Sequence, residues 1–133
     1  MRVFKGKISV IMPAFNEGHH IYENLRETHG VFCRSGRSFE IILVDDGSLD
    51  ETSAEARRAA ADFGRIVTLR LDRNRGKGNA LKEGFRMAKG DFVIFLDADL
   101  DLHPGQIKGL FRAMRDEKAD VMIGSKHHPD SSL

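Results

Sequence analysis

The chain has 133 residues, of which 41% are hydrophobic, and this is enough for one domain with a core of ordinary size. Its 21 Lys and Arg residues nearly balance its 20 Asp and Glu residues, which argues against a nucleic-acid-binding protein. No apolar run approaches the roughly 20 residues of a membrane span, and no signal peptide precedes the first strand. We therefore expect one domain over residues 1–133, on the cytoplasmic side.

The first predicted strand, Lys7–Pro13, is followed by a helix whose apolar and small side chains recur at helical spacing. We expect this face of the helix to contact the core. A single cysteine, Cys33, has no internal disulfide partner, and we expect a buried or half-buried thiol without a role. The helix face comprises Ile21, Leu25, Thr28 and Phe32, and the histidines expected at the surface are His19, His20 and His29.

The second predicted strand is Phe39–Asp46, and the residues after it predict the start of a helix. Ser48 and Glu51 have the spacing of a capping box, in which each side chain bonds a backbone N–H of the first helical turn. We expect this box to begin a helix that continues through Ala54–Phe63. The third predicted strand, Ile66–Asp72, follows directly.

Gly76–Ala88 predicts the next helix, and Phe92–Leu96 predicts a fourth strand. Pro104 fits the first position of a further helix, which precedes a fifth predicted strand at Val121–Gly124. The side chains expected to face inward are Leu81, Phe85 and Ala88 in the first of these helices and Ile107, Leu110, Phe111 and Met114 in the second.

This alternation of strands and helices predicts an α/β fold, Rossmann-like, with a mostly parallel sheet and helices on both faces. Most strands are continuous runs of Val, Ile, Leu and Phe, which is typical of strands covered on both sides. Ligands of such sheets bind beyond the carboxyl ends of the strands, where polar residues gather in this sequence. These rim residues are Asn16, Glu17, Asp45, Asp46, Asp72, Arg73, Asn74, Asp97, Asp99 and Asp101.

Three acids alternate after the fourth strand: Asp97, Asp99 and Asp101. In an extended segment such side chains point the same way. At a separation of roughly 6.5 Å and an effective dielectric of about 20, each adjacent pair repels by about 2.5 kcal/mol. A divalent cation, Mg²⁺ or Mn²⁺, would offset this cost, whereas the alternative is that the acids fan out into water.

Several known motifs fail against the sequence. An EF-hand needs Gly and Glu where Leu102 and Lys108 stand, and a P-loop needs Gly at the position of Leu71. The glycine-rich segment at 76–81 lacks the third glycine of a dinucleotide-binding finger. A haloacid-dehalogenase-like phosphatase remains a rival, although Asp101 stands where that family has Thr or Val.

Four segments together resemble the nucleotide-sugar-dependent glycosyltransferases of family 2, whose catalytic domain has the GT-A fold. The similarity is greatest to the dolichyl- or polyprenyl-phosphate hexosyltransferases, in which D-A-D-L-x-x-x-P and G-S-[KR] recur. It covers the chain from Ile8 to about His128, and it implies a C-terminally truncated chain without the acceptor-binding and membrane-associated parts. The four segments are MPAFNE at 12–17, EIILVDDGSLDET at 40–52, NRGKGNAL at 74–81 and FLDADLDLHP at 95–104.

The resemblance implies roles for individual residues. Asp97 and Asp99 are the implied catalytic metal ligands, Asp99 the more direct one, with Asp101 as a third ligand. Asp45 would bond the nucleotide base, and Asp97 would also touch the ribose. Lys77, beside two glycines, meets a phosphate or is an exposed lysine at a helix start. The implied nucleotide pocket also includes Pro13, Ala14 and Glu17, and the implied acceptor site is Lys126 and His127, which otherwise form a polar tail.

The resemblance implies an inverting transfer of a hexose from GDP-mannose or UDP-glucose to a polyprenyl or dolichyl phosphate at the cytoplasmic face of the membrane. A phosphate acceptor is already an anion and needs no general base. Two alternatives stay open: transfer to a polysaccharide or another hydroxyl acceptor, and a nucleotide-sugar-binding module without turnover. Contact with a membrane is expected only through parts absent from this chain.

Overall fold

The computed structural model describes residues 6–98, 109 and 121–124, the last four as backbone only. Within these ranges strands and helices alternate as the sequence predicts. No helix of the described part is both long and apolar enough to cross a membrane. The elements are β1 (Ile8–Ala14), α1 (Ile21–Arg34), β2 (Phe39–Asp45), α2 (Thr52–Phe63), β3 (Ile66–Arg70), α3 (Lys77–Met87), β4 (Phe92–Leu96) and β5 (Val121–Gly124).

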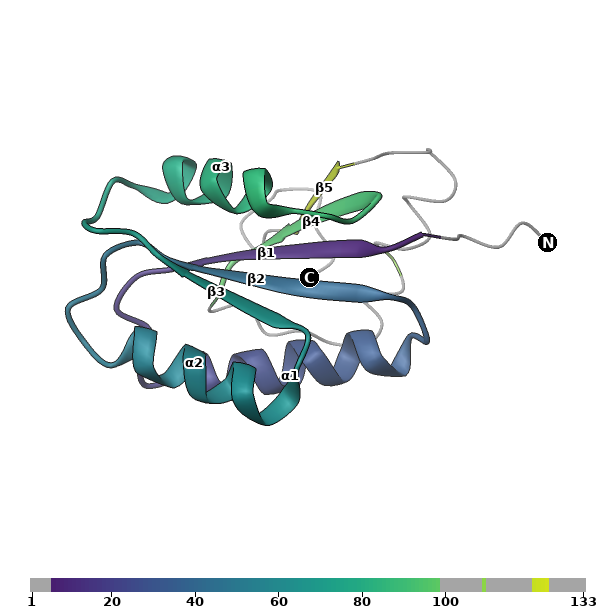
Figure 1. Ribbon diagram of the computed structural model, residues 1–133, viewed down its shortest axis with the longest axis horizontal. Coiled ribbons are helices and arrows are strands. Elements are labelled where there is room, and N and C mark those ends of the chain that lie inside the picture. Colours follow the sequence, from purple (N-terminus) through teal and green to yellow (C-terminus); the bar gives the residue numbers. More distant parts are fainter. Residues whose placement is uncertain (1–5, 99–108, 110–120, 125–133) are drawn as a thin grey trace.

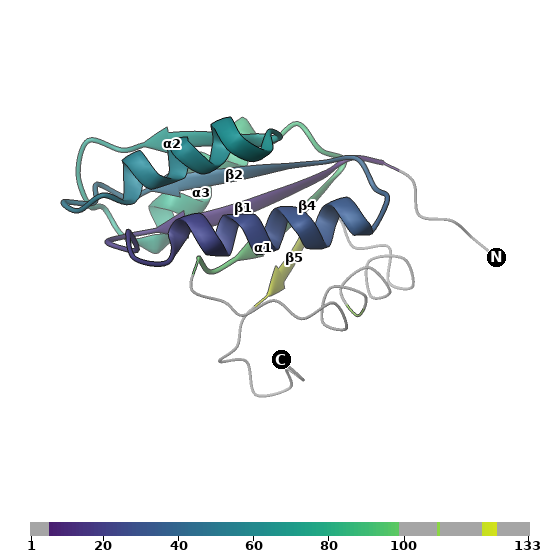
Figure 2. The same ribbon diagram turned by 90° about the horizontal axis from the view of Figure 1, so that it is seen from below.

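The strands form one sheet in the order β3-β2-β1-β4-β5, and every neighbouring pair is parallel. Helices α1 and α2 cover one face of this sheet and α3 covers the other (Figures 1 and 2). This confirms the predicted α/β fold with a parallel sheet between helices. Since all strands run the same way, their carboxyl ends lie along a single edge.

The core lies on both faces of the sheet, because side chains of a strand alternate between its two sides. All seven residues of β2 are buried. Ile41 and Leu43 pack on the side of α1 and α2, while Ile42 and Val44 pack on the side of α3. The predicted face of α1 is confirmed, since Ile21, Leu25, Thr28 and Phe32 are all buried.

Helix α3 approaches the sheet closely through its small residues, and this overturns one prediction. A Cβ at Gly84 would lie 2.5 Å from the Ile11 Cγ2, so only glycine allows this approach. Ala80 and Gly84 are the buried positions of α3, and Leu81 and Ala88 pack against the core as half-buried residues. Phe85, predicted to face inward, is 50% exposed, because its position turns it away from the sheet.

Two predictions for α1 are also corrected. The Cys33 thiol is exposed rather than buried, because it follows Phe32, which points into the core. His29 is half-buried rather than at the surface, and its ring lies between those of Phe39 and Phe63, with centroid distances of 5.6 and 5.7 Å. His19 and His20 are exposed, as predicted.

The predicted capping box at the start of α2 does not form. The N-cap residue is Glu51, and it makes no side-chain capping bond. The Ser48 hydroxyl accepts a bond from the Asn16 N–H at 2.8 Å, and the Thr52 hydroxyl accepts one from the Glu17 N–H at 2.8 Å. These hydroxyls therefore hold the loop after β1, one from the loop after β2 and one from the first residue of α2, rather than cap a helix. The helix predicted to begin at Pro104 lies outside the described residues.

Candidate functional site

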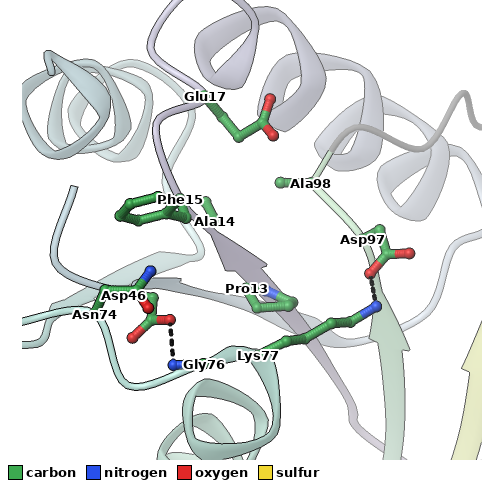
Figure 3. A pocket seen from close by; sticks show the side chains of 10 residues that line it. All are labelled: Pro13, Ala14, Phe15, Glu17, Asp46, Asn74, Gly76, Lys77, Asp97 and Ala98. Atoms are coloured by element: carbon green, nitrogen blue, oxygen red, sulfur yellow. Dashed lines mark hydrogen bonds and ion pairs between the residues drawn. The ribbon is translucent and has the colours of Figure 1, made fainter. Parts of the chain in front are cut away.

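A pocket of about 440 Å³ opens at the carboxyl edge of the sheet (Figure 3). It brings together the ends of β1, β2 and β4 and the start of α3. This is the edge at which the sequence predicts a ligand site. The lining residues are Pro13, Ala14, Phe15, Glu17, Asp46, Asn74, Gly76, Lys77, Asp97 and Ala98.

The end of β1 supplies one wall of the pocket. The predicted residues Pro13, Ala14 and Glu17 all line it, and so does Phe15, which the sequence analysis missed. Phe15 is 42% exposed, so part of its ring remains open to a ligand. Asn16 holds the loop in shape: its backbone has φ of 52°, which asparagine tolerates, and its side-chain oxygen accepts a bond from the Leu49 N–H at 3.0 Å.

Asp45 and Asp46 at the end of β2 have different surroundings, although both are buried. Asp45, predicted to bond the nucleotide base, is not among the residues that line the pocket. Its Oδ1 accepts a bond from the Ser48 N–H at 2.9 Å, whereas its Oδ2 has no hydrogen-bond donor and lies 4.0 Å from the Arg70 Nε. A buried carboxylate oxygen without a donor is costly, so a donor from a ligand would relieve this cost.

Asp46 lines the pocket and is held by the chain through both oxygens of its carboxylate. Its two oxygens accept bonds from the backbone N–H groups of Arg75 and Gly76, each at 3.0 Å. Asp46 therefore fastens the segment between β3 and α3, and so sets where α3 begins.

Gly47 allows the same two loops to touch. Its φ of 71° lies in the left-handed region, and an added Cβ would lie 2.3 Å from the carbonyl carbon of Arg73. Any other residue would push the segment between β3 and α3 away from β2. The glycine therefore has a structural role at this rim, which explains its place in the motif.

Lys77 and Asp97 face each other across the pocket and form an ion pair between Nζ and Oδ1 (Figure 3). The Asp97 side chain is 17% exposed and follows β4, while the Lys77 side chain is 59% exposed and begins α3. The N-terminus of α3 has no side-chain cap, so its first N–H groups also face this region. Asp97 is thus balanced by a cation already present in the chain.

Four of the predicted site residues lie outside the described part of the chain: Asp99, Asp101, Lys126 and His127. Among the residues that the structure does describe, no group of three or more His, Cys, Asp or Glu side chains is arranged to hold a metal ion. A half-buried carboxylate that already holds a cation has the donor chemistry that Mg²⁺ and Mn²⁺ prefer. The metal site and the acceptor site remain predictions.

Asn74 lines the pocket as a predicted rim residue, but the sequence analysis missed Gly76 and Ala98 as lining residues. Each lies within three residues of a predicted site residue, so the correct segments were found. What the sequence lacked was a signal for which side chain of each segment points into the pocket.

Curated relatives share much of this sequence. The chain is 40% identical over 128 residues to an undecaprenyl-phosphate 4-deoxy-4-formamido-L-arabinose transferase of Klebsiella pneumoniae subsp. pneumoniae, covering 96% of this chain and 39% of that protein. It is 48% identical over 106 residues to a transferase of the same name from Pseudomonas paraeruginosa, covering 77% of this chain and 31% of that protein. The chain thus spans less than two fifths of the length of these relatives.

Solved structures share the fold. A mannosyltransferase from Pyrobaculum calidifontis, solved in complex with GDP-Man and Mn²⁺, matches with a TM-score of 0.72 and 27% identity, over 84% of this chain and 33% of that one. The S. aureus TarS 1-349 fragment in complex with UDP-GlcNAc matches with a TM-score of 0.71 and 24% identity, over 96% of this chain and 36% of that one. At 24% identity the second likeness shows the fold alone.

The model of the family described as glycosyl transferase family 2 matches residues 9–132, which is almost the whole chain. The rim pocket, the parallel sheet and these relatives agree with that match. This chain belongs to glycosyl transferase family 2.

Proposed function

We propose that this chain binds the nucleotide-sugar donor in a glycosyltransferase that acts on a polyprenyl phosphate at the cytoplasmic face of the membrane. The names of the relatives favour undecaprenyl phosphate as the acceptor. They also favour a 4-deoxy-4-formamido-L-arabinose donor, a five-carbon sugar, over the hexose of GDP-mannose or UDP-glucose. We therefore replace the expected hexose with this arabinose derivative in the proposal.

The observation that carries the proposal is a single pocket that combines an open aromatic ring with a cation and an acid. The exposed part of Phe15 offers a surface on which a base can stack. The free oxygen of Asp45 can accept a bond from a base N–H once the loops adjust to the ligand. Lys77 and the open N-terminus of α3 favour the negative charge of a diphosphate.

The chemistry follows from the charges. The acceptor phosphate oxygen attacks the anomeric carbon, and the bond from that carbon to the diphosphate breaks, so that the nucleoside diphosphate leaves with both bonding electrons. Lys77 stabilises the charge that develops on this leaving group. Asp97, with Asp99 and Asp101, would hold Mg²⁺ or Mn²⁺, and a bound ion supplies Lewis-acid stabilisation. Attack from the face opposite the leaving group inverts the anomeric centre.

Calorimetry tests donor binding directly. GDP, UDP, CDP and dTDP are titrated into the chain with and without Mn²⁺, and we expect one of them to bind markedly more tightly when Mn²⁺ is present. The proposal would be wrong if none of the four bound under either condition. Radiolabelled sugar then separates the acceptors: label in the organic phase supports the lipid phosphate, and label in polymer supports a hydroxyl acceptor. Binding without transfer or donor hydrolysis would indicate a module without turnover.

A further inference from the structure

We infer that Lys77 is a resident counter-ion of Asp97, which a divalent cation displaces and which then moves to the diphosphate of the donor. This inference rests on the proposed function, because it assigns a second position to a side chain of the same pocket. Through this exchange of partners, the ion pair couples the binding of the metal to the binding of the nucleotide.

The geometry shows why the lysine and a metal ion compete. The Lys77 ammonium lies directly against Oδ1 of Asp97, within the lining of one pocket. An ammonium and a divalent cation on the same carboxylate repel each other, and at contact distance this repulsion exceeds what the singly charged ammonium gains from the acid. Metal binding at Asp97 therefore requires that the ammonium leave.

The ammonium can leave without disturbing the fold. The Lys77 side chain is 59% exposed and is a flexible four-carbon stem, so its end can swing while its backbone stays in place. The backbone is anchored at the preceding residue, because the Gly76 N–H donates to the Asp46 Oδ2 at 3.0 Å. The anchor and the mobile ammonium are thus separate parts of the same helix start.

The released ammonium has a destination in the same pocket. A diphosphate bound between Asp97 and α3 would lie against the uncapped N-terminus of that helix. A Cβ added at Gly76 or Gly78 would meet no atom within 4 Å, so the backbone on both sides of Lys77 is open to an incoming anion. Lys77 would exchange one carboxylate for phosphate oxygens and keep a negatively charged partner throughout.

The consequence is a reciprocal coupling between two ligands. Metal alone must break the ion pair with no compensation for the ammonium, whereas metal with a nucleoside diphosphate gives the ammonium a new partner. Each ligand therefore strengthens the binding of the other by the same factor, as linkage requires. Removal of the ammonium should weaken this coupling.

The test compares Lys77→Met with the unmodified chain, using Mn²⁺ and the nucleoside diphosphate that binds best. Electron paramagnetic resonance measures Mn²⁺ affinity, and calorimetry measures nucleotide affinity. Without nucleotide, we expect Lys77→Met to bind Mn²⁺ roughly two- to fivefold more tightly, about the range that a partly exposed ion pair contributes. Without metal, we expect it to bind the diphosphate more weakly. Lys82→Met is the matched control, since Lys82 is an exposed lysine of α3 that does not line the pocket.

Two results would overturn the inference in distinguishable ways. If the unmodified chain shows Mn²⁺-dependent nucleotide binding but Lys77→Met binds Mn²⁺ no more tightly than Lys82→Met, Lys77 is not a competitor of the metal and only this inference fails. If a nucleoside diphosphate binds but Mn²⁺ does not change its affinity, again only this inference fails. If none of the four nucleoside diphosphates binds with or without Mn²⁺, the proposed function fails as well. A thermal melt of each variant confirms that it is folded, and Lys77→Arg, which keeps the charge, should retain the weak Mn²⁺ binding of the unmodified chain.

Discussion

Both ends of the sheet bury carboxylates, but only one end leaves them incompletely paired. At the amino end, the buried Glu40 Oε2 accepts bonds from the Ser9 hydroxyl at 2.5 Å and from the Lys89 N–H at 2.7 Å, while its Oε1 lies 3.9 Å from the Lys7 Nζ. The Gly90 N–H closes the network by donating to the Ser9 Oγ at 2.8 Å. Every polar group of this network has a partner within the chain.

At the carboxyl end, the acids are held in place but keep hydrogen-bonding or ion-pairing capacity that a ligand can use. The Asp45 Oδ2 is buried without a donor, and Asp97 is balanced by the mobile end of a lysine. This difference distinguishes, within one sheet, the buried acids that have a structural role from the acids that can bind a ligand. A fully bonded buried acid stabilises the fold, whereas an acid with an unused oxygen or an exchangeable partner is available to a ligand.

The largest effect is expected from Asp97→Asn. This change removes the charge that a divalent cation needs, so we expect Mn²⁺-dependent affinity for the nucleoside diphosphate to fall by about a hundredfold, or about 2.7 kcal/mol, in calorimetry. Asp91→Asn is the matched control, because Asp91 is an exposed acid just before β4 and far from the pocket. An equal loss of nucleotide affinity in both variants would contradict the difference between the carboxyl and amino ends of the sheet.

Glu40→Ala tests the amino end. We expect the free energy of unfolding to fall by about 2 to 4 kcal/mol, because the Ser9 hydroxyl and the Lys89 N–H lose a buried charged acceptor. Urea denaturation measures the change, and nucleotide affinity should stay the same. In Glu55→Ala, which breaks a surface pair with Arg58, the loss should be at most about 0.5 kcal/mol. Weaker nucleotide binding by folded Glu40→Ala would contradict the comparison.

Asp45→Asn tests the role of the buried carboxylate oxygen that has no donor at the carboxyl end of the sheet. The amide keeps a carbonyl for the Ser48 N–H, so stability should change by less than about 1 kcal/mol. The affinity for the preferred nucleoside diphosphate should fall about tenfold, which is about 1.4 kcal/mol. The affinities for GDP, UDP, CDP and dTDP should also become more alike. An unchanged preference among the four would show that Asp45 does not read the base.

The smallest effect is expected at His29, whose ring packs against Phe39 and Phe63 and does not line the pocket. Burial lowers the pKa of His29, and the nearby Arg65 lowers this pKa further, although a bond with the Phe63 backbone opposes the shift. The unfolded chain therefore takes up the proton first, and stability contributed by neutral His29 is lost as the pH falls below about 6.5. Urea denaturation between about pH 7 and pH 5 measures this loss. His29→Gln should lessen the dependence on pH, whereas His20→Gln, at an exposed position, should leave it unchanged.

The sequence by itself determined the succession of strands and helices, the parallel sheet and the rim at which the site lies. The bounds of β4 were predicted correctly, and Pro13, Ala14, Glu17, Lys77 and Asp97 do line one pocket. The strands, the sheet and the rim follow from periodicity and from the polar residues after each strand, which depend on neighbours along the chain. The pocket residues were implied by the resemblance to family 2 glycosyltransferases.

The tertiary structure alone decided which side chains meet. Asp97 pairs in the structure with Lys77, which is 20 positions earlier (97 minus 77) and reaches it only because β4 lies beside β1 in the sheet. Gly84 rather than Phe85 is the position of α3 that faces the sheet, where it lies close to Ile11, and Phe85 is exposed. Ser48 bonded the loop after β1 rather than its own helix. A local pattern cannot fix such partners, since they depend on strand order and on how closely each helix approaches the sheet.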